Sequence, residues 1–287
     1  MLRIILFITW RNYLKVSSGR TGKQRCWRKQ SLLGLLLTHF YFGDMVISGI
    51  QIVITGRLSG WNLPLFQIII KGARYRGCAT TAKAFKADLL MNRGAEGDYA
   101  EAIRLADEVI GSSEFGLEAT YRDIFTNGYN SKELMFTRHL KSVPTMMANV
   151  GSLLKLFGGG TYKPSKLFLE ILTPKDKRYV VTLDSMVIGN GTLAKKAIVW
   201  KKHYITSGDC PMYYMRVAQM YLIKAEAMAR TNASIKDCID VLNVLRERSG
   251  NTLFDETDYS SLAEVLEEVF RENVRELGME NGGIFYL

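Results

Sequence analysis

Aromatic side chains are frequent in the middle of the chain, and their chemistry suits contact with sugars. The flat face of Tyr or Trp can stack on the C–H face of a sugar ring, while its polar edge and nearby amides or acids bond the hydroxyls. Aromatic character and loop position single out four candidate ligand-binding residues. Packing in a core or turn is the alternative for each ring. The candidates are Trp200, Tyr204, Tyr162 and Phe157.

Other chemistry-bearing patterns are weak, so the sequence predicts no enzyme, no cofactor and no metal site. Gly158-Gly159-Gly160 precedes Lys163, but a phosphate loop needs G-x-x-x-x-G-K-[ST] between a strand and a helix. No G-x-S-x-G nucleophile elbow is present. The three histidines lie far apart, and the four cysteines form no CxxC pair. The cysteines are therefore expected to be buried or incidental thiols.

Two clusters of charged residues could be functional or could simply be exposed to solvent. Lys195-Lys196 and Lys201-Lys202 surround Trp200, which could bind nucleic acid through charge and stacking. A solvated basic turn is preferred. Glutamates at positions 264, 267, 268 and 272 fall on one predicted helix. We expect them to form a solvated face of that helix rather than an acid/base pair.

The charge of the chain is unevenly distributed and divides it into two unlike parts. Its 287 residues contain 38 Lys or Arg and 28 Asp or Glu, a formal net charge of +10. Residues 1–77 hold 12 of the bases and a single acid, Asp44, whereas residues 78–287 hold 26 bases and 27 acids. A basic excess can indicate a nucleic-acid or anionic-membrane partner, and here that inference could apply only to the N-terminal part. We divide the chain into residues 1–71, an atypical basic segment, and residues 72–287.

The N-terminal segment fits no standard targeting signal. Residues 1–10 form a short apolar run without a small-residue cleavage site, which makes a poor signal peptide. Residues 31–55 approach the length of a membrane span, but Asp44 and His39 fall inside it and a buried Asp is costly there. Two interpretations stay open: core elements of a soluble fold, or a segment that is non-native, as a shifted reading frame would produce.

Residues 72–287 carry helical periodicity, and the fold class is predicted to be mainly α. Apolar and small residues recur at spacings of three and four, with Asp98/Glu101, Ser234/Asp237 and Ser261/Glu264 placed as capping boxes. Two helix pairs of about 33 residues suggest tetratricopeptide-like units, with generic αα-hairpins as the alternative, because the spacing alone does not separate the two. A long loop-rich insertion, 111–214, separates them. The predicted helices cover residues 81–92, 99–110, 216–230, 235–247 and 262–277.

Four groups of segments, in order along residues 72–287, resemble the SusD/RagB family of nutrient-binding outer-membrane lipoproteins of Bacteroidetes. The departures from the family pattern are Gln219 where Glu is usual, Asn281 where Gly is usual, and the lack of a lipobox and of the family's early helices in 1–70. The chain also stops where members continue, so it resembles a fragment of a longer protein. The matching segments are AKAFKADLLMNRGAEGDYAEAIRLADEVI with FGLEATYRDIF and KELMF; KPSKLFLEILTPKDKRY; CPMYYMRVAQMYLIKAEAMAR with CIDVLNVLRERSG; and VFRENVRELGMENG.

The resemblance implies a SusD-like α fold and a role in nutrient uptake without catalysis. The protein would bind an oligosaccharide or other nutrient at the surface of the outer membrane, held there by a lipid anchor. It would deliver the ligand to a SusC-like TonB-dependent transporter, with its helices facing the transporter and its irregular loops carrying the ligand. Four polar residues that match family motifs are expected to hold helices together: Arg216, Glu226, Asn243 and Arg246, with Arg246 paired to an acid one turn away.

A protein-interaction scaffold is the alternative function. Tetratricopeptide-like helices bind peptides in such proteins, without glycan binding. The long insertion between the helix pairs counts against it.

Overall fold

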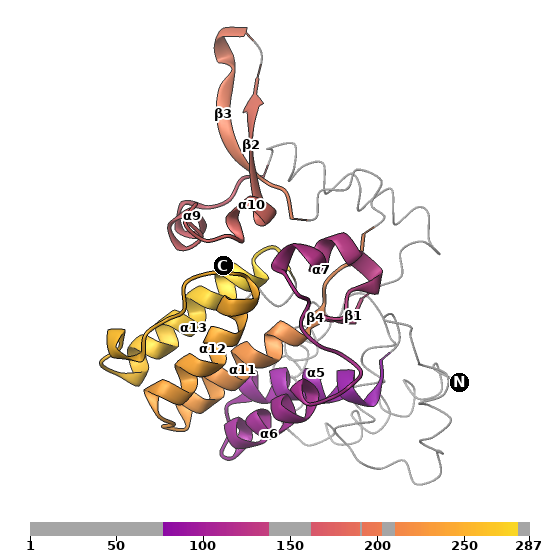
Figure 1. Cartoon of the computed structure of the whole chain (residues 1–287), viewed down its shortest axis with the longest axis vertical. Coiled ribbons are helices and arrows are strands. Elements are labelled where there is room, and N and C mark those ends of the chain that lie inside the picture. The colour runs from indigo at the N-terminus through magenta and orange to yellow at the C-terminus, as the bar shows by residue number, and fades with distance from the viewer. Residues whose placement is uncertain (1–76, 138–161, 190, 203–209, 281–287) are drawn as a thin grey trace, which may run out of the picture. The chain divides into compact units, whose positions relative to one another are not determined.

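The computed structural model describes residues 77–137, 162–189, 191–202 and 210–280, all of which belong to one structural unit, Gln67–Leu287. The predictions for residues 1–71, and those for Phe157 and Tyr204, lie outside the described residues. Figure 1 shows a helical body with a two-stranded hairpin projecting from it. The prediction of a mainly α fold is confirmed.

Five longer helices form the body. The helix α11 contacts the pair α5–α6 as well as α12 and α13 (Figure 1). The bounds are α5 Ala79–Arg93, α6 Asp98–Ile110, α11 Val217–Arg230, α12 Ile235–Arg248 and α13 Leu262–Leu277. These agree with the predicted helices to within about two residues at each end, a normal uncertainty for helix ends.

Small residues let the first helices approach closely. Ala84 and Ala87 of α5 and Ala102 and Ala106 of α6 are fully buried, and α6 also packs against α11. A second core joins the remaining helices. It consists of Ala218, Leu222, Ala225 and Ala229 of α11, Cys238, Ile239, Leu242 and Leu245 of α12, and Val265, Val269 and Leu277 of α13.

The helix ends follow the predicted caps with one exception. Ser234 accepts a hydrogen bond from the backbone N–H of Asp237, and Ser261 accepts one from that of Glu264. The predicted capping box at Asp98 is wrong: Gly97 is the N-cap of α6, and Asp98 is the first helical residue. The carboxylate of Asp98 instead accepts hydrogen bonds from the Arg93 guanidinium and the backbone N–H of Ala95. A nearby arginine competes better for the carboxylate than the exposed helix N-terminus does.

The segment between the helix pairs contains short elements where the sequence predicted loops. They are α7 Tyr121–Asn127, η1 Gly128–Asn130, β1 Leu134–Phe136, α9 Lys166–Ile171, α10 Tyr179–Thr182, β2 Leu183–Ile188, η2 Gly191–Leu193, β3 Lys195–Trp200 and β4 Met215–Arg216, with η3 Glu256–Asp258 lying later, between α12 and α13. The strands β1 and β4 pair antiparallel, as do β2 and β3. Gly189 and Gly191 take positive φ angles of 91° and 57° in the β2–β3 turn, a region that glycine enters without a steric cost.

The base of the hairpin is anchored in a third core. Leu183 and Trp200, the first residue of β2 and the last of β3, form a cross-strand pair. Both are buried in a cluster with Phe168 and Leu172 of the α9 segment and Val274 of α13. Farther out, Ser185–Val187 of β2 are exposed. The base of the hairpin is therefore packed against the body, while its outer end is exposed to solvent.

Candidate functional site

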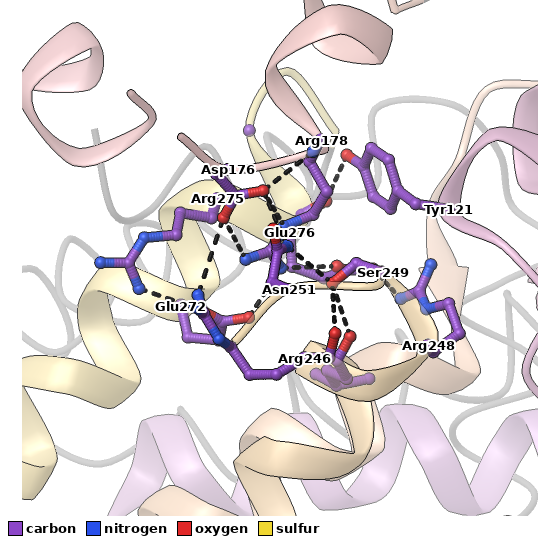
Figure 2. A network of polar contacts seen from close by, with 12 residues as sticks. Tyr121, Asp176, Arg178, Arg246, Arg248, Ser249, Asn251, Glu272, Arg275 and Glu276 are labelled. Carbon is purple, nitrogen blue, oxygen red and sulfur yellow. Dashed lines mark hydrogen bonds and ion pairs between the residues drawn. The ribbon is translucent and has the colours of Figure 1, made fainter. Parts of the chain in front are cut away.

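Ten ionisable side chains, buried or nearly so, meet where the insertion contacts the helical body, and we call this group the buried ion network. Figure 2 shows the part of it around Arg178, Glu272 and Glu276. It brings five acids together with five bases, so its formal charge is balanced. Its members come from the turn before α10, the end of β3, β4, α12, α13 and the residue before β1. They are Glu133, Asp176, Glu272, Glu276 and Glu280 with Arg178, Lys202, Arg216, Arg246 and Arg248.

Arg178 links the turn before α10 to α13. Its guanidinium is fully buried and contacts Asp176 through two nitrogens, at 2.8 and 3.0 Å. One further nitrogen, Nη1, donates to Glu272 at 2.6 Å and to Glu276 at 3.1 Å. Burial takes the N–H donors of the planar guanidinium out of water, and the carboxylates on two sides of it supply the hydrogen-bond acceptors that water would have provided.

Arg216 stands at the start of α11 and joins three carboxylates. Its Nε lies 2.5 Å from Glu280, and its Nη1 lies 2.6 Å from Glu133 and 3.1 Å from Glu276. Its Nη2 also donates to the backbone carbonyl of Glu276 at 3.1 Å. The expectation that Arg216 holds helices together is therefore confirmed.

The helix α12 contributes two arginines to the same acids. Arg248 bonds to Glu276 and lies 3.3 Å from Glu133. Arg246 lies 3.7 Å from Asp176 and 3.8 Å from Glu272, and it donates to the carbonyl of Thr252. Arg246 thus joins α12 to other segments, and the expectation that it pairs with an acid one turn away is wrong.

Lys202 closes the network at the end of β3. Its ammonium donates to the carbonyls of Glu276 and Gly278 at 2.9 and 3.0 Å and lies 2.5 Å from the Glu280 carboxylate. It also sits 5.3 and 5.1 Å from the ring centroids of Tyr121 and Phe125. Lys202 was expected on a solvated turn, and that expectation is wrong because the last carbonyls of α13 and an acid offer it a buried partner set.

Burial and pairing compete at each of these groups. Burial opposes the charged form of Glu276, but Arg248, Arg216 and Arg178 outweigh it and hold its pKa far below the usual range. Burial prevails at Glu133, where it raises the pKa despite Arg248 and Arg216. Burial also lowers the pKa of Lys202 to about 8, against the attraction of Glu280. Removing charges from water is costly, so the network holds only while its partners stay in place.

The network connects elements that lie far apart in the sequence. Every acid in it contacts an arginine or lysine. Among the described residues, no cluster of three or more His, Cys, Asp or Glu could hold a metal ion. Within the same residues, no helix is long and apolar enough to cross a membrane. What the network does is fix the base of the β2–β3 hairpin and the α9–α10 turn onto α13.

The predicted ligand residues fall into different environments. Tyr162 is exposed, with 51% of its surface accessible. Trp200 is only 7% exposed and packs edge-on against Phe168, with ring centroids 4.6 Å apart. Such packing is that of a core aromatic and leaves no open ring face for a sugar. The roles of Tyr162, Trp200, Phe157 and Tyr204 in ligand binding stay predictions.

Sequence reasoning missed most of the network, although part of its signal was present. Glu272 was expected on a solvated face, and that expectation is wrong because the side chain is fully buried. Glu272, Glu276 and Glu280 are spaced by four residues, which places acids on one side of a helix.

Asn243 of α12 and Glu226 of α11 were also expected to hold helices together. Asn243 fastens the loop after α12, because its amide both donates to and accepts from the backbone of Phe254, at 3.0 and 2.8 Å. Glu226 pairs with Arg230 within α11 itself. Asn243 therefore holds a loop against its own helix, and the ion pair of Glu226 stays on its own helix, so neither of these contacts joins two helices as expected.

Comparison with solved structures shows the same fold. A SusD superfamily protein from Bacteroides thetaiotaomicron matches with TM-score 0.57 and 21% identity, over 75% of this chain and 50% of that one. Surface glycan-binding protein A from Bacteroides uniformis matches with TM-score 0.54 and 17% identity, over 78% of this chain and 54% of that one. A structure determined with a xylogluco-oligosaccharide matches with TM-score 0.55 and 21% identity, over 74% of this chain and 51% of that one.

These comparisons cover only part of each relative, since the chain spans about half the length of the solved structures it matches. A search of curated proteins finds no match. The model of the SusD family matches residues 189–286, which include β3, β4, α11, α12 and α13 with most of the buried ion network. The comparisons thus show that the chain shares the helical fold of these solved structures and that residues 189–286 are similar to the SusD family.

Proposed function

We propose that this protein binds an oligosaccharide at the cell surface and passes it to a SusC-like TonB-dependent transporter of the outer membrane. The observation that carries the proposal is the SusD family match over 189–286 together with a fold shared with a structure that holds a xylogluco-oligosaccharide. In this role the protein breaks no bond in its ligand. It is held at the membrane by a lipid anchor, as the family resemblance implies for proteins of Bacteroidetes.

The arrangement of the described residues supports a division of labour. The helices α5, α6, α11, α12 and α13 form a regular body of the kind that serves as an interaction surface. The α9–β3 segment, residues 162–202, is bound to that body through Arg178 and Lys202 and exposes its outer surface. We assign the helices to the transporter and the irregular segment to the ligand.

Tyr162 is the described aromatic residue best suited to contact a sugar. Half of its surface is accessible, and it lies just before α9 on the irregular segment. Trp200 is less suited, because its ring is needed in the core with Phe168. Phe157 and Tyr204 keep their proposed roles, and their positions lie outside the described residues.

Calorimetric titration of the full chain with a panel of oligosaccharides, xyloglucan fragments included, tests the proposal. We expect binding to at least one glycan. Replacing Tyr162 by Ala should weaken it about two- to tenfold, since an aromatic contact contributes about 0.5–1.5 kcal/mol. Leu253→Ala is the matched control, because Leu253 is equally exposed, at 53%, but lies outside the α9–β3 segment, in the loop after α12.

Two outcomes would contradict the proposal. If no oligosaccharide binds while peptides do, the protein is an interaction scaffold. If a bound oligosaccharide is cleaved, the protein is an enzyme.

A further inference from the structure

The α9–β3 segment has a charge opposite to that of the rest of residues 78–287. Residues 162–202 contain nine Lys or Arg and three Asp or Glu, whereas the remainder of 78–287 contains 17 bases and 24 acids. The near-neutral total of residues 78–287 therefore conceals a strongly basic segment on an acidic body. Such polarisation favours an oriented approach of charged ligands.

The buried members of this segment do not account for its excess charge. Arg178 and Lys202 are used in the buried ion network, and Asp176 is buried with them. The other seven bases are exposed lysines, and the segment exposes only two acids. The lysines are Lys163, Lys166, Lys175, Lys177, Lys195, Lys196 and Lys201.

The two exposed acids each neutralise one lysine. Glu170 lies 3.8 Å from Lys166, and Asp184 lies 3.7 Å from Lys201. Within the described ranges, the remaining five lysines form no ion pair: Lys163, Lys175, Lys177, Lys195 and Lys196. We call these five the unpaired lysines.

The unpaired lysines are spread over an extended surface. Lys163 precedes α9, Lys175 and Lys177 lie in the turn between α9 and α10, and Lys195 and Lys196 begin β3. As neighbours on a strand, Lys195 and Lys196 point to opposite faces of the hairpin. A compact anion such as phosphate needs converging donors, whereas separated lysines suit a polymer with charges at intervals.

We propose that the ligand of this surface is an acidic polysaccharide, one that carries carboxylate or sulfate groups along its chain. The inference rests on the proposed function and narrows it to a ligand class. The unpaired lysines supply the counter-charges, and the exposed Tyr162 next to Lys163 supplies a ring for a sugar face. The acidic helical body repels the same polymer, so within residues 78–287 the attraction is concentrated on the α9–β3 segment.

An anionic membrane surface fits the exposed side chains less well. Insertion into lipid needs apolar side chains gathered on one side. Leu167 and Val180 lie on separate helices, and Met186 and Val187 are neighbours on β2 that point to opposite faces. The lysines therefore favour a soluble polymer.

Affinity electrophoresis and calorimetry of the full chain with polygalacturonate, heparin and neutral mannan test this inference. We expect binding to at least one of the two acidic polymers, weakened as salt is raised because exposed charges are screened. The variant Lys163→Gln, Lys175→Gln, Lys195→Gln, Lys196→Gln should lose about tenfold in affinity. The matched control removes four paired lysines from the helices, Lys83→Gln, Lys86→Gln, Lys224→Gln, Lys236→Gln, and should bind almost as well as the parent.

The possible results separate this inference from the proposed function. Equal binding of neutral mannan and the acidic polymers, or equal loss in the two variants, overturns the inference and leaves glycan binding in place. Binding of vesicles containing phosphatidylglycerol without binding of any polysaccharide overturns both. Circular dichroism of each variant verifies that the helical fold is retained.

Discussion

At the scale of single residues, Arg216 shows how completely the fold determines the state of a side chain. It is 1% exposed, and burial alone would favour its neutral form, yet Glu280, Glu276 and Glu133 raise its pKa well above the usual value. A buried pair of this kind contributes little net stability compared with an apolar pair, but losing one partner is costly because the others remain charged and dry. The buried ion network is therefore sensitive to single substitutions.

Replacing Arg216 by Leu should lower the free energy of unfolding by about 3–5 kcal/mol, since three carboxylates lose a shared partner. Urea denaturation followed by circular dichroism measures the loss. Arg271→Leu is the control, because Arg271 forms an exposed pair with Glu267 on α13. A surface pair contributes at most about 1 kcal/mol, so comparable losses in the two variants would contradict the structural role given to Arg216.

At the scale of elements, close contact between helices depends on alanines. The periodicity of α5, α6 and α11 was visible in the sequence, and the structure adds that their alanines are completely buried at the contacts. Short side chains leave no space for a larger one there. Helix pairs of this kind tolerate changes on their outer faces far better than at the alanine positions.

Ala106→Leu should lower the free energy of unfolding by about 1–3 kcal/mol, since extra methylenes force the packed helices apart. Ala100→Leu on the same helix is the matched control, because Ala100 is exposed and the substitution leaves the contact intact. Thermal unfolding of both variants measures the difference. An Ala106 variant as stable as the Ala100 variant would show that α6 is not tightly packed.

The contact between α5 and α11 should respond to mild acid. Burial raises the pKa of Asp88 to about 6, although Gln219 opposes the shift through a hydrogen bond, and Glu226 adds to it. A raised carboxyl pKa means that the folded state binds the proton more tightly than the unfolded state. The contribution of Asp88 to stability is therefore full below pH 3.8 and is lost as the pH rises through about 6.

Asp88→Asn should remove this loss and raise the free energy of unfolding at pH 7 by up to about 2–3 kcal/mol. Urea denaturation at several pH values between 4 and 7 measures it against the parent protein. Glu226→Gln keeps Asp88 but removes the neighbouring negative charge, so its transition should move to lower pH. A parent and an Asp88 variant with the same pH dependence would show that the carboxyl is not perturbed.

At the scale of the whole described unit, stability and exposure are divided between body and hairpin. The body has continuous cores, whereas β2 and β3 pair only with each other among the described residues. A two-stranded ribbon is marginal in water unless something holds its base. Here Leu183, Trp200 and the neighbouring Lys202 provide that hold.

Hydrogen exchange should therefore be graded along the hairpin. We expect the backbone amides of β2 and β3 near Ile188 and Lys195 to exchange much faster than those near Leu183 and Trp200, and both to exchange faster than the amides of α11. Mass spectrometry of peptic peptides measures the rates. Equal protection of the outer hairpin and α11 would mean that a further contact covers the strands.

The sequence by itself determined the helices and most of their caps, because helical periodicity and the Ser234 and Ser261 caps are local properties of the chain. It also indicated a resemblance to the SusD/RagB family, since four ordered motifs lie along one chain. Only the tertiary structure decided which charges are buried. Glu272 and Lys202 are of residue types that usually lie in solvent. They become buried because segments about seventy to a hundred residues apart in the sequence supply their partners. Ion pairs between such distant segments leave little local signal, so their partners become evident only in the folded chain.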